Sequence, residues 1–161
     1  MIELAQLVAV AGATFAALVD LRWRRIPNWL TGSVLLLGLG VNLWLKGPGG
    51  IAFALFGALL GGAILLPFYL HRAIGAGDVK LLAALGAVLG PQAVVAVVLY
   101  AAVAGGLISL VLLSRRARLG QALFDMIRRP TRMRLSGAKA PYGVAIASGV
   151  YLSLLLPWLH G

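Results

Sequence analysis

Cysteine is absent from this chain of 161 residues, and acidic residues are scarce. Without cysteine there are no disulfides, thiolate zinc sites or cysteine nucleophiles, and thiol redox chemistry is not expected. The 14 Lys and Arg residues against four Asp and Glu residues give a net charge of +10. These basic residues lie in the gaps between long apolar runs, which favours anionic lipid headgroups over nucleic acid as their partner.

Hydrophobic residues make up 61% of the chain and charged residues 11%, a composition typical of a membrane protein. Because a spanning helix needs about 20 residues, the length suits one helical bundle, a single domain over residues 1–161. Runs close to spanning length cover residues 2–19, 29–45, 51–70, 92–113 and 142–159. A further apolar run, from Leu81 to Leu89, is shorter and could span or re-enter the membrane.

The distribution of basic residues decides between these topologies, since Lys and Arg in short loops collect on the cytoplasmic side. Six spans with the N-terminus outside leave only Lys46 on the outer side. The cytoplasmic side then holds Arg22, Arg24, Arg25, Arg72, Lys80 and the eight basic residues from Arg115 to Lys139. Basic residues follow the first apolar run rather than precede it, which indicates a retained helix and not a cleavable signal peptide. The sequence therefore predicts an all-α bundle of six transmembrane helices with a short fourth helix.

The only long polar stretch covers about residues 114–140. Within it, apolar residues at helical spacing face basic ones until Pro130, which predicts an amphipathic helix on the cytoplasmic surface. Anchoring to anionic lipid is the simpler interpretation, and a surface for docking substrate is the alternative. Elsewhere, Gly57 with Gly61 and Gly86 with Gly90 have the four-residue spacing that lets membrane helices approach closely, so a packing role is predicted.

Two of the acidic residues, Asp20 and Asp78, have no ordinary solvated explanation. Asp20 closes the first span, where the partial negative charge of the helix end disfavours an anion. Asp78 follows Gly75 and Gly77 and begins the short fourth helix, where capping of exposed N–H groups is an equally good explanation. In the predicted topology both residues lie on the cytoplasmic side, so their carboxyls can meet.

Two close carboxyls cannot both ionise cheaply, so they share a proton, and one can accept a proton from water while the other donates. Such a pair titrates as a unit, and neither residue is assigned as base or acid. This chemistry cleaves peptide bonds without metal or cofactor, and none is predicted. The alternative is a small ion- or proton-coupled transporter that uses the same aspartates as a relay. A relay across the membrane would need a further carboxylate deeper in the bundle, which the sequence lacks.

Three segments resemble the type IV prepilin peptidases, membrane aspartic proteases of the GxGD type. Gly75-Ala76-Gly77-Asp78-Val79-Lys80 matches the family's GxGD-(V/I)-K motif. Asp20 followed by Ile26-Pro27-Asn28 is similar to the first catalytic position, and Lys139-Ala140-Pro141-Tyr142-Gly143 is similar to the segment that opens the last helix. The resemblance covers nearly the whole chain. It implies that Asp20 and Asp78 are catalytic and that the protein removes the short basic leader of prepilins, after a glycine, at the cytoplasmic face of the bacterial inner membrane.

Larger members of that family carry a cytoplasmic insertion, usually with cysteine pairs, and methylate the new N-terminus. Here the first loop covers only about Leu21 to Asn28, so methyltransferase activity is not expected. The chain is most similar in form to the dedicated peptidases of Tad (Flp) pilus and secretion systems, with archaeal preflagellin peptidases as the nearby alternative. The sequence does not indicate an oligomeric state.

The supporting residues of these segments also have simpler interpretations. Pro27 suits the first turn of the second helix, and Asn28 suits a partner for unpaired backbone groups. Lys80 either extends to the membrane surface or tunes Asp78. Pro141 and Gly143 suit helix entry and close contact, and Tyr142 suits an interfacial aromatic residue.

Overall fold

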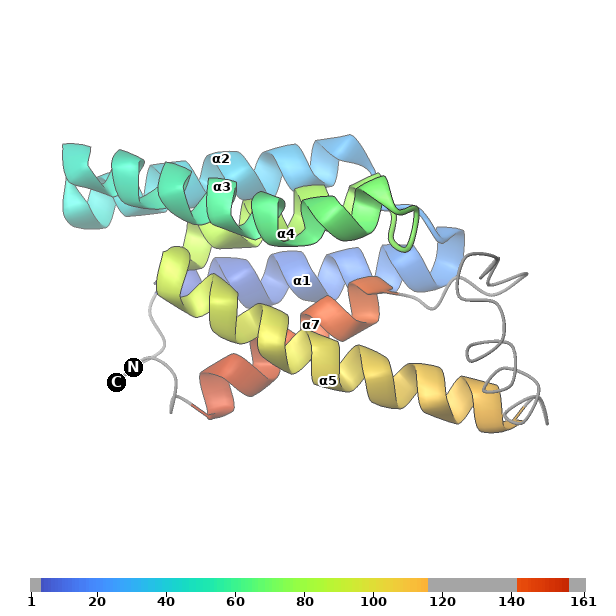
Figure 1. The fold of residues 1–161 in the computed structure, drawn as a ribbon. Helices are drawn as coiled ribbons and strands as arrows, with labels where there is room; N and C mark the ends of the chain where they lie inside the picture. The colour runs from blue at the N-terminus through green and yellow to red at the C-terminus, as the bar shows by residue number, and fades with distance from the viewer. Residues whose placement is uncertain (1–3, 116–141, 157–161) are drawn as a thin grey trace.

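The protein is described by a computed structural model over residues 4–115 and 142–156, and these ranges are entirely helical apart from short connections (Figure 1). The helices are α1 (Leu4–Trp23), α2 (Asn28–Lys46), α3 (Pro48–Leu70), α4 (Ala76–Leu89), α5 (Pro91–Arg115) and α7 (Tyr142–Leu155). The predicted all-α class is therefore confirmed. The predicted amphipathic segment at about 114–140 overlaps the end of α5 and otherwise lies outside the described residues, as do Lys139 and Pro141.

Four of these helices are long and apolar enough to cross a membrane, namely α1, α2, α3 and residues 91–111 of α5. The predicted runs match the helices to within a few residues at most ends. One difference is that α1 continues past Asp20 to Trp23, so only residues 24–27 separate α1 from α2. The predicted first loop, Leu21 to Asn28, was therefore too long by one helical turn.

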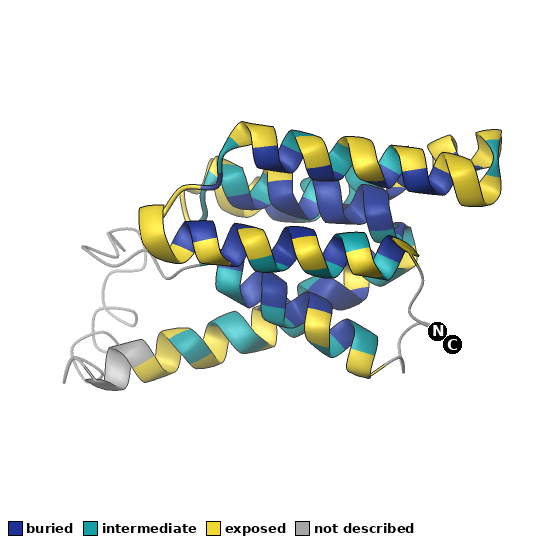
Figure 2. Cartoon of the chain, turned by 180° about the vertical axis from the view of Figure 1, so that it is seen from behind, coloured by how far each residue is buried: buried dark blue, intermediate teal, exposed yellow. Residues whose placement is uncertain are grey.

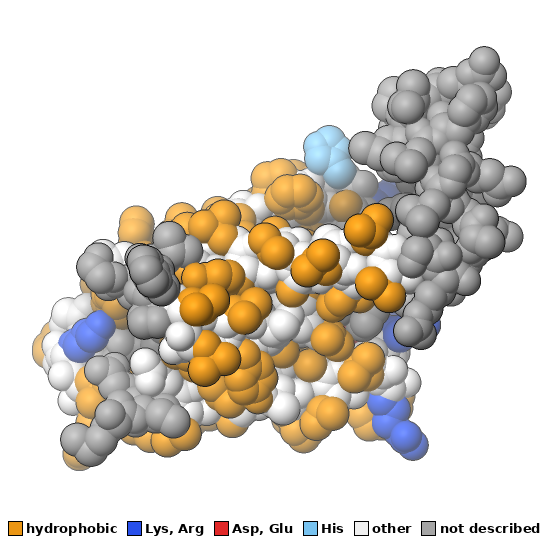
Figure 3. Space-filling view, turned by 90° about the horizontal axis from the view of Figure 1, so that it is seen from below, with side chains coloured by type: hydrophobic (Ala, Val, Ile, Leu, Met, Phe, Trp, Pro, Cys, Tyr) orange, Lys and Arg blue, Asp and Glu red, His pale blue; other side chains and the backbone are white. Residues whose placement is uncertain are grey.

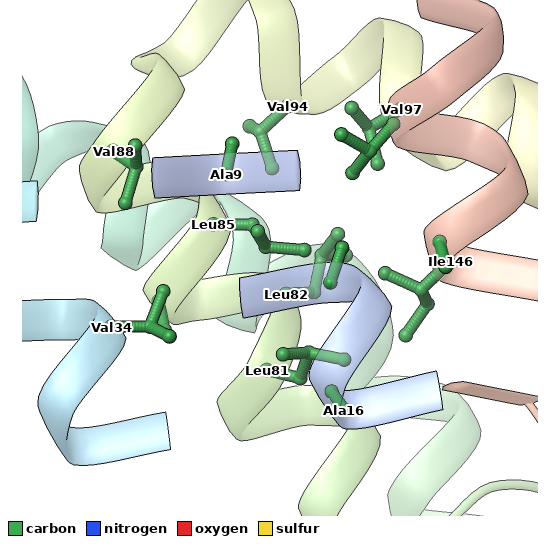
Figure 4. Close-up of a cluster of buried hydrophobic side chains, with 14 of the residues drawn as sticks. Ala9, Ala16, Val34, Leu81, Leu82, Leu85, Val88, Val94, Val97 and Ile146 are labelled. Carbon is green, nitrogen blue, oxygen red and sulfur yellow. The ribbon is translucent and has the colours of Figure 1, made fainter. Parts of the chain in front are cut away.

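The short helix α4 lies at the centre of the bundle and contacts each of the other five described helices. Its 14 residues include Leu81, Leu82, Leu85 and Val88, which are at most 1% exposed. These side chains meet Ala9 and Ala16 of α1 and apolar side chains of α2, α5 and α7 in one core (Figure 4). Because other helices surround α4, its apolar residues are not confined to one face as they are in an amphipathic helix.

The outer surface of the bundle is apolar rather than polar. Large side chains such as Leu36, Leu59 and Val103 are more than half exposed. On the face of the molecule shown in Figure 3, apolar side chains cover the middle. The visible Lys and Arg side chains lie toward the two ends of the molecule. Seen from behind, buried and exposed positions alternate along the outer helices, so each of them has a side that faces away from the bundle (Figure 2). A continuous apolar band of this kind is typical of a protein whose surroundings are lipid.

The crossing of α3 and α4 depends on glycine. A Cβ atom at Gly86 would collide with the carbonyl oxygen of Gly57, and a Cβ atom at Gly57 would collide with that of Gly86. A Cβ atom at Gly61 would lie 2.6 Å from the carbonyl oxygen of Leu82. The predicted packing role of Gly57, Gly61 and Gly86 is therefore confirmed, because the two backbones touch directly at this crossing.

Replacing Gly86 with alanine is expected to lower the free energy of unfolding by about 1–3 kcal/mol, the usual cost of forcing an extra carbon into a filled core. The measurement is reversible unfolding of the purified protein in mixed micelles. Gly40→Ala is the matched control, because nothing lies within 4 Å of a Cβ atom there. Equal stability of the Gly86→Ala and Gly40→Ala variants would contradict this account of the α3–α4 crossing.

Candidate active site

The predicted site residues that the structure describes gather at one end of the bundle, where α1 ends and α2, α4 and α7 begin (Figure 1). Asp20 lies in the last turn of α1, and Asp78 is the third residue of α4. Asn28 is the first residue of α2, and Tyr142 is the first residue of α7. The antiparallel course of the chain therefore brings segments far apart in the sequence to the same end.

Asp20 is 8% exposed and is bound by α7. Its Oδ2 atom accepts a hydrogen bond of 3.0 Å from the backbone N–H of Gly143. Gly143 is the second residue of α7, so its N–H belongs to the first turn, which has no partner within its own helix. The positive end of the α7 dipole thus faces the carboxylate and offsets the unfavourable position of Asp20 at the end of α1.

Gly143 is required at this contact by its size. A Cβ atom at position 143 would lie 3.0 Å from both the Cβ and Oδ2 atoms of Asp20. This separation is tighter than ordinary van der Waals contact, so a larger residue would displace the carboxyl or the start of α7. Gly143 therefore both supplies the hydrogen-bond donor and leaves room for the Asp20 side chain.

Asp78 is 9% exposed and lies in the first turn of α4. Its Oδ2 atom accepts a hydrogen bond of 3.1 Å from the backbone N–H of Gly75, the residue that precedes the helix. In return, the carbonyl oxygen of Gly75 accepts from the N–H of Asp78 at 3.2 Å. This is the capping role that the sequence left open. It fixes the orientation of one edge of the carboxyl group.

Gly77 brings the first turn of α4 against the connection between α1 and α2. A Cβ atom at position 77 would lie 3.1 Å from the Cβ atom of Ile26 and 3.4 Å from its carbonyl oxygen. Ile26 itself is buried. The residue before Asp78 therefore touches the short connection that begins four residues after Asp20.

Lys80 and Asn28 form a second contact at this end. The Nζ atom of Lys80 donates a hydrogen bond of 2.9 Å to Oδ1 of Asn28, and both side chains are exposed. The sequence predicted that Asn28 would pair with backbone groups. In the structure its side-chain oxygen instead binds Lys80 of α4. Pro27 precedes α2 as its capping residue rather than lying in the first turn, and its carbonyl oxygen accepts from the N–H of Leu30 at 3.2 Å.

Helix α7 contacts both helices that carry the aspartates. Its second residue, Gly143, donates its N–H to Asp20 of α1, and α7 also contacts α4, whose first turn contains Asp78. Tyr142, the first residue of α7, packs against the buried core. Within residues 4–115 and 142–156, no group of three or more His, Cys, Asp or Glu side chains could hold a metal ion.

A cleft of about 560 Å³ opens beside the site, between the end of α1 and the start of α2. Two of its lining residues lie next to the site. Val19 precedes Asp20 in the sequence, and Ile26 contacts Gly77. Phe15 and Trp29 meet edge to face across it, with ring centroids 6.0 Å apart. A second cleft lies between Leu4 and Trp44, and none of its lining residues is ionisable.

Comparison with known proteins points in one direction. Residues 7–110 match the model of the type IV leader peptidase family. The chain is 45% identical over 100 residues to proteins named prepilin leader peptidase/N-methyltransferase in two strains of Burkholderia pseudomallei, 1026b and K96243. These alignments cover 58% of this chain but only 32% of each relative. No solved structure gives a significant match. The family match includes Asp20 and Asp78 and stops before Tyr142, so it covers less of the chain than the motifs predicted.

Proposed function

Because this chain belongs to the type IV leader peptidase family, we propose that it is a membrane aspartic endopeptidase that removes the leader peptide of Flp-like type IV prepilins. Asp20 and Asp78 are the catalytic pair in this proposal. The observation that carries it is the convergence of α1, α4 and α7 at one end of the bundle, where Gly143 of α7 binds Asp20 of α1 and Asp78 lies in the first turn of α4, which contacts both other helices.

The proposed reaction is attack of water on the peptide carbonyl next to the leader. Two carboxyls held close together share one proton, so the ionised member takes a proton from water while the protonated member donates to the substrate. The pair titrates as a unit, and the two roles are not divided between Asp20 and Asp78. The hydrogen bonds from Gly143 and Gly75 hold one oxygen of each carboxyl, which orients the group before substrate arrives.

The cleft beside α1 and α2 supports access of an extended peptide to this pair. Its lining joins apolar side chains to Arg25 and Asn28, so it suits a segment that passes from lipid to the polar surface. In this proposal the hydrophobic helix of the prepilin lies against the bundle and its leader junction unwinds beside Val19 and Ile26. Unwinding is required because helical hydrogen bonds occupy the carbonyl that water must attack.

We further propose six membrane crossings, with the active-site end in the cytoplasm of a bacterium. Arg24 and Arg25 follow α1, and Arg72 follows α3, so these basic residues lie at the same end as the aspartates. Lys46 ends α2 at the opposite end. Since basic residues collect on the cytoplasmic side, this distribution supports an N-terminus outside. The short helices α4 and α7 complete the six crossings, α4 being shielded from lipid by its neighbours.

The proposed activity is restricted to peptide cleavage. The relatives carry a name with two activities, and the chain aligns with about a third of their length. The α1–α2 connection of residues 24–27 leaves no room for a domain there, so methylation of the product is not proposed. Family membership gives no support to the alternative of an ion- or proton-coupled transporter.

The test is incubation of the purified protein in liposomes with an Flp-type prepilin and a methyl donor, followed by mass spectrometry of the products. The expected result is release of the leader and a mature pilin whose N-terminus lacks the added methyl mass. A pH-sensitive dye inside the same liposomes reports proton movement. Proton flux without leader release would overturn the peptidase proposal in favour of the transporter.

A further inference from the structure

Asn42 is a buried polar side chain among apolar helices, near the end of α2 that is far from the active site. It is 2% exposed, and its Nδ2 atom lies 2.9 Å from the carbonyl oxygen of Ala87 and 3.0 Å from that of Val88. The same atom lies 3.1 Å from the carbonyl oxygen of Gly38 in its own helix. An amide has two hydrogens, so these three acceptors share them. Asn42 therefore bridges α2 to the last turn of α4.

The end of α4 needs such a donor. In a continuous helix the carbonyl of Ala87 would accept from the N–H of residue 91, but that residue is Pro91, which has no N–H. Val88 also lies in the last turn, where helical carbonyls lack partners. Ala87 and Val88 are at most 1% exposed, and a carbonyl left unpaired away from water is strongly destabilising. Asn42, on a neighbouring helix, supplies the N–H donor that Pro91 lacks.

The position of Asn42 is itself fixed by close contacts. Gly38, one turn earlier on the same face of α2, lets the helix touch α4: a Cβ atom there would lie 2.8 Å from the backbone nitrogen of Val88. On the other side, a Cβ atom at Gly50 of α3 would collide with the carbonyl oxygen of Asn42. The backbone around Asn42 is thus closely packed where α2, α3 and α4 meet.

We propose that Asn42 is a positioning residue for the peptidase reaction: it sets the axial position of α4 and thereby the location of Asp78. This inference rests on the proposed function. Asp78 and Val88 are ten residues apart, or about 15 Å along the helix axis. The chain has two asparagines, Asn28 and Asn42, and both connect α2 to α4, one near each end. Because the Lys80 contact with Asn28 is exposed, the buried contact of Asn42 is the stronger of the two.

A thiol pair can report the position of α4, since the natural chain has no cysteine. The Cβ atom of Ala83 in α4 lies 3.6 Å from where a Cβ atom of Gly62 in α3 would be, a separation that suits a disulfide. In a Gly62→Cys, Ala83→Cys parent, the rate of disulfide formation measures how well these positions stay in register. A shift of α4 by one residue would rotate Ala83 by about 100° and move it by about 1.5 Å.

The expected result is that Asn42→Ala slows disulfide formation several-fold. In the background without cysteines it lowers kcat for leader release by about tenfold or more, with KM changed by less than about twofold. Asn42→Ser, whose hydroxyl can bond within its own helix but is too short to reach α4, gives the same pattern and guards against a folding failure of the alanine variant. Asn42→Gln keeps the amide donor and retains most of both rates.

Ser153→Ala is the matched control. Ser153 is also 2% exposed, but it donates 2.9 Å to the Val150 carbonyl within its own helix, so its loss leaves both readouts unchanged. Disulfide formation at the parent rate in both Asn42→Ala and Asn42→Ser would overturn the inference. So would slower disulfide formation with an unchanged kcat, or a change confined to KM. If the parent cleaves no prepilin, the proposed function fails, while the disulfide rates still decide whether Asn42 places α4.

Discussion

Replacing either Asp20 or Asp78 with asparagine is expected to lower kcat/KM for leader release by about 10³-fold or more. General acid and base groups contribute about 10²- to 10⁴-fold each, and a pair that shares one proton loses its function when either member is removed. The amide oxygen of asparagine can still accept from the N–H of Gly143 or Gly75, so each variant keeps the contact that holds its side chain. The measurement is the rate of leader release by purified protein at saturating and at low prepilin concentration.

Asp125→Asn serves as the control for loss of one negative charge, because Asp125 lies in the long polar stretch of the sequence, where a solvated carboxylate is ordinary. That variant is expected to cleave at the natural rate. Thermal unfolding in detergent should show that the Asp20→Asn and Asp78→Asn variants are folded. Retention of substantial cleavage in either of these two folded variants would remove that residue from the catalytic pair.

Replacing Gly143 with alanine is expected to lower kcat for leader release by about tenfold or more while the protein stays folded. The added Cβ atom would lie 3.0 Å from Oδ2 of Asp20, so the carboxyl or the start of α7 must move by a few tenths of an ångström. A displacement of about 1 Å at a catalytic group can cost about 10²-fold in rate. Gly143→Val adds two further carbons at the same place and is expected to reduce the rate still more.

Gly32→Ala is the matched control for the Gly143 variants, since nothing lies within 4 Å of a Cβ atom at position 32. It makes the same chemical change in a helix and is expected to leave cleavage unchanged. Measurement of kcat separately from KM is needed, because under the proposed mechanism displacement of Asp20 is expected to act on the chemical step. Natural kcat in Gly143→Ala would mean that the contact with Asp20 has no part in the reaction.

Much of the fold could be predicted from the sequence because lipid imposes strong rules on it. Apolar runs near spanning length located α2, α3 and most of α5, and glycine spacing predicted a packing role for Gly57 and Gly86 without showing that they meet each other. The end of α1 was harder to predict, because the sequence from Leu21 to Trp23 suits either a helix or a surface loop. The structure shows that the helix continues to Trp23.

The candidate site was predictable as a set of residues but not as a set of contacts. Acidic residues are few, and the unfavourable place of Asp20 at a helix end was visible in the sequence. Its compensation by the N–H of Gly143 was not, because the two residues are 123 positions apart and meet only through the course of α7. The contact between Lys80 and Asn28, 52 positions apart, was hidden for the same reason.

Asn42 was missed although the sequence carried a signal for it. An asparagine inside an apolar run needs a partner, and the Gly90-Pro91 pair at the end of the next short run removes an N–H donor from α4. Each feature alone is common. Their relation becomes visible only when α2 and α4 are seen in contact.

The central claim is that Asp20 and Asp78 lie together at one end of the bundle. The most direct measurement is intramolecular crosslinking of an Asp20→Cys, Asp78→Cys protein with a short bifunctional thiol reagent, possible because the natural chain has no cysteine. The account predicts efficient crosslinking of this pair and none of an Asp20→Cys, Val88→Cys pair, whose second member lies at the other end of α4. Failure of the aspartate-position pair to crosslink, with both thiols shown to react singly, would contradict it.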